Sequence, residues 1–121
     1  MNYNRGDIVI LPFPFVTTKG TRQKARPALV ISDHSIKRRF NDVILVAITS
    51  QKIDDIKQTE FLIAEGSIEF KKSGLLKDSV VRCEYVMTVP KEIIVRKLGN
   101  LPNNIMGKIN EKLKLSIGLC G

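Results

Sequence analysis

Short apolar runs separated by polar turns dominate the pattern of this chain. The runs from Ile8 to Leu11, from Ala28 to Ile31 and from Asp42 to Thr49 hold few polar residues, which predicts three strands, the second buried on both faces and the third also buried. The segments from Glu60 to Ile63 and from Ile93 to Leu98 predict a short fourth strand and a last strand. The pattern therefore indicates a chain built mainly of strands.

The segment from Ser79 to Val89, SVVRCEYVMTV, predicts a further strand, because its residues divide between two faces with a period of two. Arg82 and Glu84 lie on the same face in this register, between Val80 and Val86. Two opposite charges at this spacing are either a pair placed for chemistry or an ordinary ion pair between strands. The sequence leaves both interpretations open.

The segment from Pro102 to Ile117 predicts a helix, because its apolar residues recur one turn apart. Its buried side would hold Ile105, Ile109 and Leu113 with Met106 and Ile117 nearby, and its outer side Lys108, Lys112 and Lys114. Strands and helices do not alternate, so a mainly β (α+β) fold is expected: a small barrel or twisted sheet with a C-terminal helix. We expect one domain over residues 1–121.

The connections are predicted to be polar. The PFPF segment from Pro12 to Phe15 is expected to leave the sheet as an extended arm, because proline cannot donate to a strand ladder. Its two phenylalanine rings would pack on the core or, alternatively, stack on bases. Val16 to Ala25 is predicted to be a ligand-binding loop, Ser32 to Asn41 a second basic turn, and Gly66 to Gly74 a polar connection.

The distribution of charge points to a polyanionic partner. The formal net charge is +8, and the segment from Thr17 to Asp42 holds seven Lys or Arg against two Asp. About a fifth of the chain thus carries most of the excess charge. A basic cluster beside two loops is typical of nucleic-acid binding.

Several classes of site are excluded by the rest of the composition. Cys83 and Cys120 are too few for a disulfide framework or a thiolate metal site, and His34 is the single histidine. Asp54 and Asp55 are neighbours without a third carboxylate close by, which predicts a solvated turn and no metal site. No cofactor is expected. The apolar runs are too short to span a membrane, and the chain is expected to be cytoplasmic.

Arg26 is the leading candidate for phosphate binding. It precedes Pro27 and the apolar run that follows, so we expect it at the mouth of a strand, where a guanidinium can bind a phosphate through two hydrogen bonds. The alternative is a solvated arginine at a strand end. The residues from Thr49 to Gln51 place two hydroxyls and an amide after another strand, which is either part of a site or ordinary turn chemistry.

These motifs together resemble the MazF/PemK toxins of type II toxin-antitoxin pairs over nearly the whole chain. The resemblance rests on the order and spacing of five features: RGDIVILPFPF (Arg5 to Phe15), the Gly20 loop before RPALVIS (Arg26 to Ser32), VAITS (Val46 to Ser50), DSVVRCE (Asp78 to Glu84) and the terminal helix. It implies an SH3-like barrel and a homodimer that cuts single-stranded RNA sequence-specifically without a metal, inhibiting translation and growth. The implied protein partner is an antitoxin with an acidic C-terminal tail.

The resemblance also implies the site residues. Arg26 and Thr49 match the arginine and threonine of MazF-type members, and Arg82 with Glu84 matches the pair of PemK-type members. RNA binding is assigned to Lys19, Arg22, Lys24, Ser50 and Gln51. After Gly20 this chain carries Thr21 and Arg22 where several relatives have His or Glu, so no proton transfer is expected from that loop.

These residues suit RNA cleavage by its own 2′-OH, which needs a base, positive charge for the phosphorane and an acid for the leaving oxygen. Glu84 is the expected base, assisted or replaced by Thr49. Arg26 and Arg82 would stabilise the developing charge. Two other interpretations stay open: a non-catalytic SH3-like module that binds nucleic acid, and a toxin that inhibits a protein such as gyrase.

Overall fold

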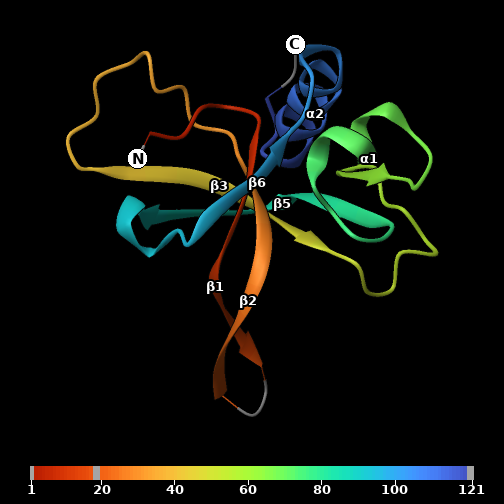
Figure 1. Ribbon diagram of the computed structural model, residues 1–121, viewed down its shortest axis with the longest axis horizontal. Coiled ribbons are helices and arrows are strands. Elements are labelled where there is room, and N and C mark those ends of the chain that lie inside the picture. The colour runs from red at the N-terminus through yellow and green to blue at the C-terminus, as the bar shows by residue number, and fades with distance from the viewer. Residues whose placement is uncertain (1, 18–19, 120–121) are drawn as a thin grey trace.

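The apolar runs pair into one antiparallel sheet with the strand order β4-β5-β3-β2-β1-β6. The computed structural model describes residues 2–17 and 20–119, except for the side chains of residues 13–17 and 20–23. Its strands are β1 (Asp7–Thr17), β2 (Gly20–Val30), β3 (Asp42–Thr49), β4 (Glu60–Ile63), β5 (Ser79–Pro90) and β6 (Arg96–Asn100). Figure 1 shows that β1 and β2 form a long hairpin that projects from the rest of the sheet.

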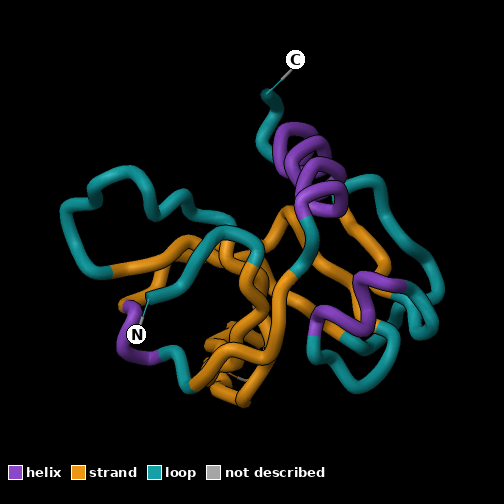
Figure 2. Tube along the Cα trace, turned by 45° about the horizontal axis from the view of Figure 1, so that its top comes forward, coloured by secondary structure: helices purple, strands orange, loops and turns teal. Residues whose placement is uncertain are grey.

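The central strands are buried on both sides, as predicted. Leu29 and Val46 belong to a core cluster that also contains Ile105 and Ile109 of helix α2 (Asn103–Ser116). Their neighbours Ala28 and Leu45 belong to a second cluster, because successive side chains of a strand point to opposite faces. The sheet curls around these clusters, and α2 lies across one side of it (Figure 2). The predicted mainly β fold with a C-terminal helix is confirmed.

The PFPF segment does not leave the sheet, so this prediction is wrong. β1 continues through it and pairs with β2, with Pro12 opposite Ala25 and Pro14 opposite Gln23. The two prolines are two residues apart, so their nitrogens face the same edge, and the ladder with β6 on β1 ends at Ile10. Proline is tolerated there because no further partner strand needs its missing N–H. The rings of Phe13 and Phe15 lie outside the described side chains.

Two predicted loops are also shorter than expected. Most of Val16 to Ala25 lies in the β1–β2 hairpin. The segment from Gly66 to Gly74 contains helix α1 (Ile68–Ser73), whose first turn is capped by the Ser67 hydroxyl accepting from Phe70 N. One and a half turns are too few to show helical periodicity in a sequence.

The ends of two other elements differ from the prediction. The last strand begins at Arg96, later than predicted, because the 3-10 turn η1 (Lys91–Ile93) precedes it. In α2 the buried stripe holds Ile105, Met106 and Ile109, with Leu113 partly buried against it, whereas Ile117 is 62% exposed and lies beyond the helix end. No helix among the described residues is long and apolar enough to cross a membrane.

The cysteines, the histidine and the neighbouring aspartates were expected to have no catalytic role. Cys83 is fully buried, and burial raises the pKa of its thiol to about 11, so it stays protonated at neutral pH. Cys120 lies outside the described residues. His34 lies in the loop after β2, where its Nε2 is 2.6 Å from the Ser32 hydroxyl. Asp54 and Asp55 lie in an exposed turn.

Gly99 provides a test of this packing, because β6 crosses α1 there without room for a side chain. A Cβ on Gly99 would lie 2.2 Å from the Lys72 carbonyl oxygen, while one on Gly107 in α2 would meet nothing within 4 Å. We expect Gly99→Ala to lower the free energy of unfolding by about 1 to 3 kcal/mol or more through overpacking.

Gly107→Ala is the matched control, and it should raise the free energy of unfolding by up to about 1 kcal/mol because alanine favours a helix. Urea denaturation of both variants measures these changes. Equal stability of the two variants would contradict the close crossing of α1 and β6.

Candidate active site

A cavity of about 470 Å³ brings together most of the predicted site residues. Arg26 and Lys24 line it from β2, and Thr49, Ser50 and Gln51 line it from the end of β3. Arg26 does not lie at a strand mouth as predicted, because β2 extends well beyond it and Arg26 pairs with Leu11 of β1. The arginine is therefore held within a strand, and its backbone is more restricted than the sequence indicated.

The cavity forms where two paired strands separate. The last pair between β2 and β3 is Ala28 with Ala47, and continuing this register by two residues would place Arg26 across from Thr49. There β3 pairs only with β5 on its other side, through Thr49 and Val80. The gap between the strands gives side chains from both of them access to one space.

Other residues complete this cavity from segments distant in the sequence. Lys77 lies in the connection between α1 and β5, and Arg96 begins β6 opposite Ile10. Neither residue was predicted. Nothing in the sequence shows that β6 pairs with β1, which brings Arg96 here, or that the connection holding Lys77 lies beside the end of β3. The lining thus holds four cationic residues (Lys24, Arg26, Lys77 and Arg96) and no acidic one, together with apolar residues that include Ile48 and Leu98. This combination suits an anion that carries an apolar ring, such as a nucleotide.

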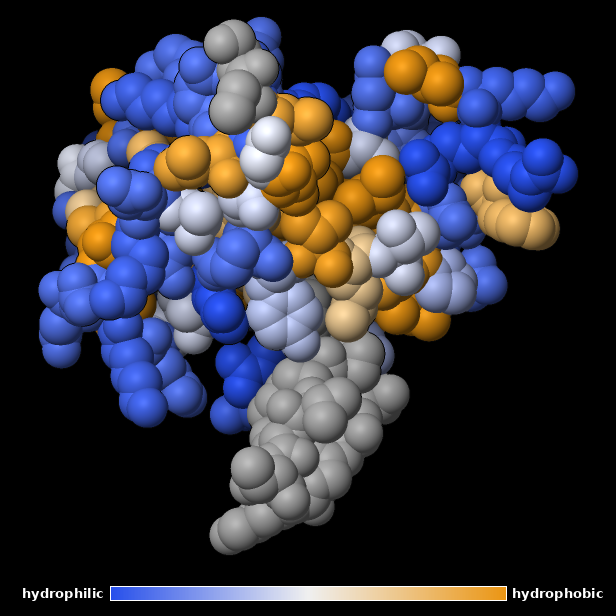
Figure 3. Space-filling view, turned by 180° about the vertical axis from the view of Figure 1, so that it is seen from behind, coloured by the Kyte–Doolittle hydropathy of each residue, from blue (hydrophilic) through white to orange (hydrophobic). Residues whose placement is uncertain are grey.

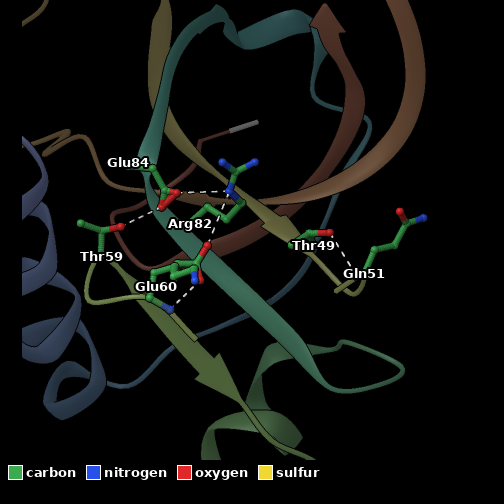
Figure 4. Close-up of polar contacts among 7 residues, drawn as sticks. Thr49, Gln51, Thr59, Glu60, Arg82 and Glu84 are labelled. Carbon is green, nitrogen blue, oxygen red and sulfur yellow. Dashed lines mark hydrogen bonds and ion pairs between the residues drawn. The ribbon is translucent and has the colours of Figure 1, made fainter. Parts of the chain in front are cut away.

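The predicted pair on β5 forms a second cluster. Arg82 Nε donates to Glu84 Oε2 at 3.2 Å, and Glu84 Oε1 accepts from the Thr59 hydroxyl at 3.1 Å (Figure 4). Glu60, directly opposite Arg82 on β4, adds a second carboxylate 3.9 Å from Arg82 Nε. The Arg82 guanidinium also lies 5.3 Å from the centre of the Tyr85 ring. Glu60, Thr59 and Tyr85 were not predicted. Glu60 and Thr59 come near the β5 pair through the pairing of β4 with β5, and the register of two strands cannot be seen in either segment alone.

A bulge in β5 gives Glu84 its position. Val46 of β3 pairs with Val86, but the next residue, Ala47, pairs with Arg82, so the residues from Cys83 to Tyr85 have no partner on β3. Cys83 N bonds instead to the Thr59 carbonyl at 3.0 Å. Bulges commonly redirect a side chain beside an active site, and here the bulge presents Glu84 to solvent next to Arg82.

The pairing of β3 with β5 places Arg82 of the second cluster and Thr49 of the cavity on one face of the sheet. Arg82 lies opposite Ala47 and Val80 lies opposite Thr49, so Arg82 and Thr49 are diagonal neighbours on the same side of β3 and β5. Long side chains span such diagonals. The structure thus places Arg82 and Glu84 beside the cavity, although neither lines it.

Two predicted RNA-binding residues cannot be placed. Lys19 lies outside the described residues, and Arg22 is described only by its backbone in β2. Lys24 is exposed, and the Thr49 hydroxyl accepts from Gln51 N at 3.1 Å. Among the described residues, no group of three or more His, Cys, Asp or Glu side chains has the arrangement of a metal site.

Comparisons with known proteins agree with this fold and identify the family. Residues 4–117 match the model of the family described as PemK-like, MazF-like toxin of type II toxin-antitoxin system. The chain is similar to endoribonuclease EndoA of Bacillus subtilis (strain 168), with 31% identity over 120 residues that cover 98% of this chain and 97% of that protein.

Solved structures show the same fold. An endoribonuclease in complex with its cognate antitoxin, from a mycobacterial species, is 21% identical with a TM-score of 0.74 and covers 99% of both chains. The MazE-MazF complex from Deinococcus radiodurans is 20% identical with a TM-score of 0.69, covering 98% of this chain and 100% of that one. The resemblance inferred from the sequence motifs is confirmed by these matches.

Proposed function

The chain belongs to the PemK-like, MazF-like family of type II toxins, and on this premise we propose that it is an endoribonuclease that cuts single-stranded RNA at specific sequences without a metal ion. The observation that carries the proposal is the cavity at the separation of β2 and β3, which Arg26 and Thr49 line together with Lys24, Lys77 and Arg96. An RNA phosphate is the anion that this cavity suits, with the apolar lining available to an adjacent base.

The reaction that these residues support is transesterification. The 2′-oxygen forms a bond to phosphorus, the bond from phosphorus to the 5′-oxygen breaks, and the products carry a 2′,3′-cyclic phosphate and a 5′-OH. We assign the 2′-OH proton to Glu84, and the support for this is that its carboxylate is partly exposed and held by Arg82 and Thr59. Thr49 assists as a hydrogen-bonding group, or replaces Glu84 as the leading residue in proton transfer.

The two arginines have different surroundings and hence different roles. Arg26 faces the cavity, where it would stabilise the negative charge of the phosphorane. Arg82 holds Glu84 in position and adds positive charge at the edge of the same face. The leaving oxygen would receive its proton from water, since a guanidinium is a poor acid at neutral pH.

We further propose that the chain acts in the cytoplasm as a homodimer and that a cognate antitoxin binds it through an acidic C-terminal tail. The charge of the cavity supports the tail, because its lining is cationic. The solved relatives named above include an endoribonuclease in complex with its cognate antitoxin, which supports this class of partner.

Incubation with a long RNA in EDTA tests the activity as a whole. An endoribonuclease yields discrete fragments with 5′-OH ends, whereas a non-catalytic module or an inhibitor of a protein such as gyrase leaves the RNA intact. The ion pair between Arg82 and Glu84 would suit such a module equally well, so this experiment decides between them.

We expect Arg26→Ala and Glu84→Gln each to lower the cleavage rate by about 100-fold or more, as is typical for the loss of a charge stabiliser or a general base. Single-turnover rates measure the loss, and circular dichroism should show an unchanged fold. Arg26→Ala should also weaken RNA binding, whereas Glu84→Gln removes a negative charge and should bind equally well or better. Full activity of Glu84→Gln alone would assign proton transfer to Thr49 or to a water that it orients.

Binding of a non-cleavable RNA should weaken steeply with salt, because each neutralised phosphate releases about 0.7 counterions from a single strand. Replacing Lys77 or Arg96 with Ala should reduce the slope of log K against log salt. Lys108→Ala, on the exposed side of α2, is the control that should leave the slope unchanged. A flat salt dependence of the unmodified protein would rule out the cationic cavity as the binding surface.

Sedimentation at micromolar concentration should show a dimer. The apolar side chains of Leu115, Ile117 and Leu119 are each more than half exposed at the C-terminal end, and an isologous interface would bury such a surface twice. A single species at the 13.6 kDa mass of one chain would contradict this expectation.

A further inference from the structure

A second polar cavity, of about 500 Å³, lies at the other end of β3 from the candidate active site. We name it the distal groove. Its walls are the N-terminal segment, the loop between β2 and β3, and Lys91 at the start of η1. Its lining includes Asn2, Asn4, Lys37, Arg38, Arg39 and Phe40. Neither the fold nor the proposed cleavage chemistry requires a groove here.

The distal groove carries an excess of positive charge. Lys37, Arg38, Arg39 and Lys91 line it against the single carboxylate of Asp42. Arg38 is paired with Asp42 at 2.7 Å, and Lys91 donates to the Asn2 side chain at 2.8 Å. In the described part of the chain, Lys37 and Arg39 take part in no hydrogen bond or ion pair. Their charges are available to an anionic ligand.

An exposed aromatic ring stands beside these charges. Phe40 is 71% exposed, although burying a phenylalanine side chain is normally favourable. It follows Arg39 directly in the loop. Figure 3 shows the loop on the upper right of that face, where hydrophobic residues project among strongly hydrophilic ones. A ring next to free cations is the usual platform on which an unpaired base stacks.

Amide side chains supply the third element of recognition. Asn2, Asn4 and Asn41 line the same groove, and all three are exposed. An amide both donates and accepts hydrogen bonds, so it matches the edges of bases. An acidic peptide would use the cations and could bond to the amides, but its carboxylates would gain nothing from the exposed ring of Phe40. The combination therefore favours nucleic acid over an acidic peptide.

We propose that the distal groove binds single-stranded RNA, with Lys37 and Arg39 on phosphates and Phe40 stacked on a base. The inference rests on the proposed function, since the same RNA molecule would extend from the cleavage site to the distal groove. β3 joins the two sites, and its eight residues span about 23 Å between their Cα atoms. Tyr3, which lines the distal groove, packs in the second core cluster together with Leu11, the residue opposite Arg26. Both sites therefore border the second core cluster, although Ile48 and Leu98 of the cavity pack with the first.

A fluorescence experiment tests the stacking directly. The chain contains no tryptophan, so Phe40→Trp introduces a single reporter. The oligonucleotide for the titration carries 2′-O-methyl groups and has about 16 nucleotides, the upper size of a single-strand site. Its binding should quench the fluorescence of this tryptophan until the site is saturated. Ile68→Trp is the matched control, because Ile68 in α1 is also 71% exposed, and its fluorescence should stay unchanged. Binding of the same oligonucleotide, measured by anisotropy, without quenching of Phe40→Trp would overturn the proposal.

The length of the RNA provides a second test. Phe40→Ala should raise the Kd of the 16-nucleotide oligonucleotide about tenfold, while that of an oligonucleotide of about 4 nucleotides, which reaches only the cavity, should change less than about twofold. Phe40→Tyr should restore binding, and Phe40→Leu should not. These ligands are not cleaved, so the result is independent of whether natural RNA is cut.

Three other outcomes would overturn the proposal. If Phe40→Ala and Arg39→Ala left the Kd of the long oligonucleotide unchanged, RNA would not bind in the distal groove. If these variants no longer bound an acidic antitoxin-tail peptide but still bound RNA, the groove would be assigned to that peptide. Conversion of Phe40→Ala to a monomer in sedimentation would assign it to a second copy of the chain.

Discussion

The separation of β2 from β3 beyond the pair of Ala28 with Ala47 is the constraint on which the site depends. Up to this pair both strands are buried on both faces, and apolar side chains fill the space around them. Beyond it the ladder ends, and Arg26 and Thr49 occupy the positions that a further pair would take. The cavity therefore combines rigid backbones with polar side chains, since each strand remains paired on its other edge.

The sequence predicted best the elements that are a continuous apolar run or carry a clear helical period between polar turns. β3 and β4 have the predicted bounds, and the terminal helix differs by a residue at each end. The failures have local causes. Pro12 and Pro14 suggested an interrupted strand, but the edge that their nitrogens face has no partner beyond Ile10. Helix α1 was too short to show a period, and its signals were the Ser67 cap and Gly74 in the left-handed conformation.

The candidate site was predictable only in part. Arg26, Thr49 and the pair of Arg82 with Glu84 were found through motifs, and the structure brings them to one face. Arg96 and Glu60 were not, because their place depends on strands that pair across long stretches of sequence. Register of this kind follows from the whole sheet and from no single segment. The bulge that presents Glu84 was equally invisible, since SVVRCEYVMTV alternates without interruption.

The strength of the ion pairs of Arg82 decides which of them can be exchanged for a bound phosphate. Its side chain is 39% exposed, and ion pairs in such positions contribute only about 0 to 1 kcal/mol. The contact with Glu60 at 3.9 Å is the longer of the two, so it is the first to be exchanged, while the 3.2 Å bond to Glu84 persists. Release of Glu60 would leave Arg82 with one carboxylate, and its guanidinium has enough donors for that carboxylate and a phosphate oxygen together. Under the proposed mechanism, Arg82 can thereby connect Glu84, the proposed base, to the reacting phosphate at little cost.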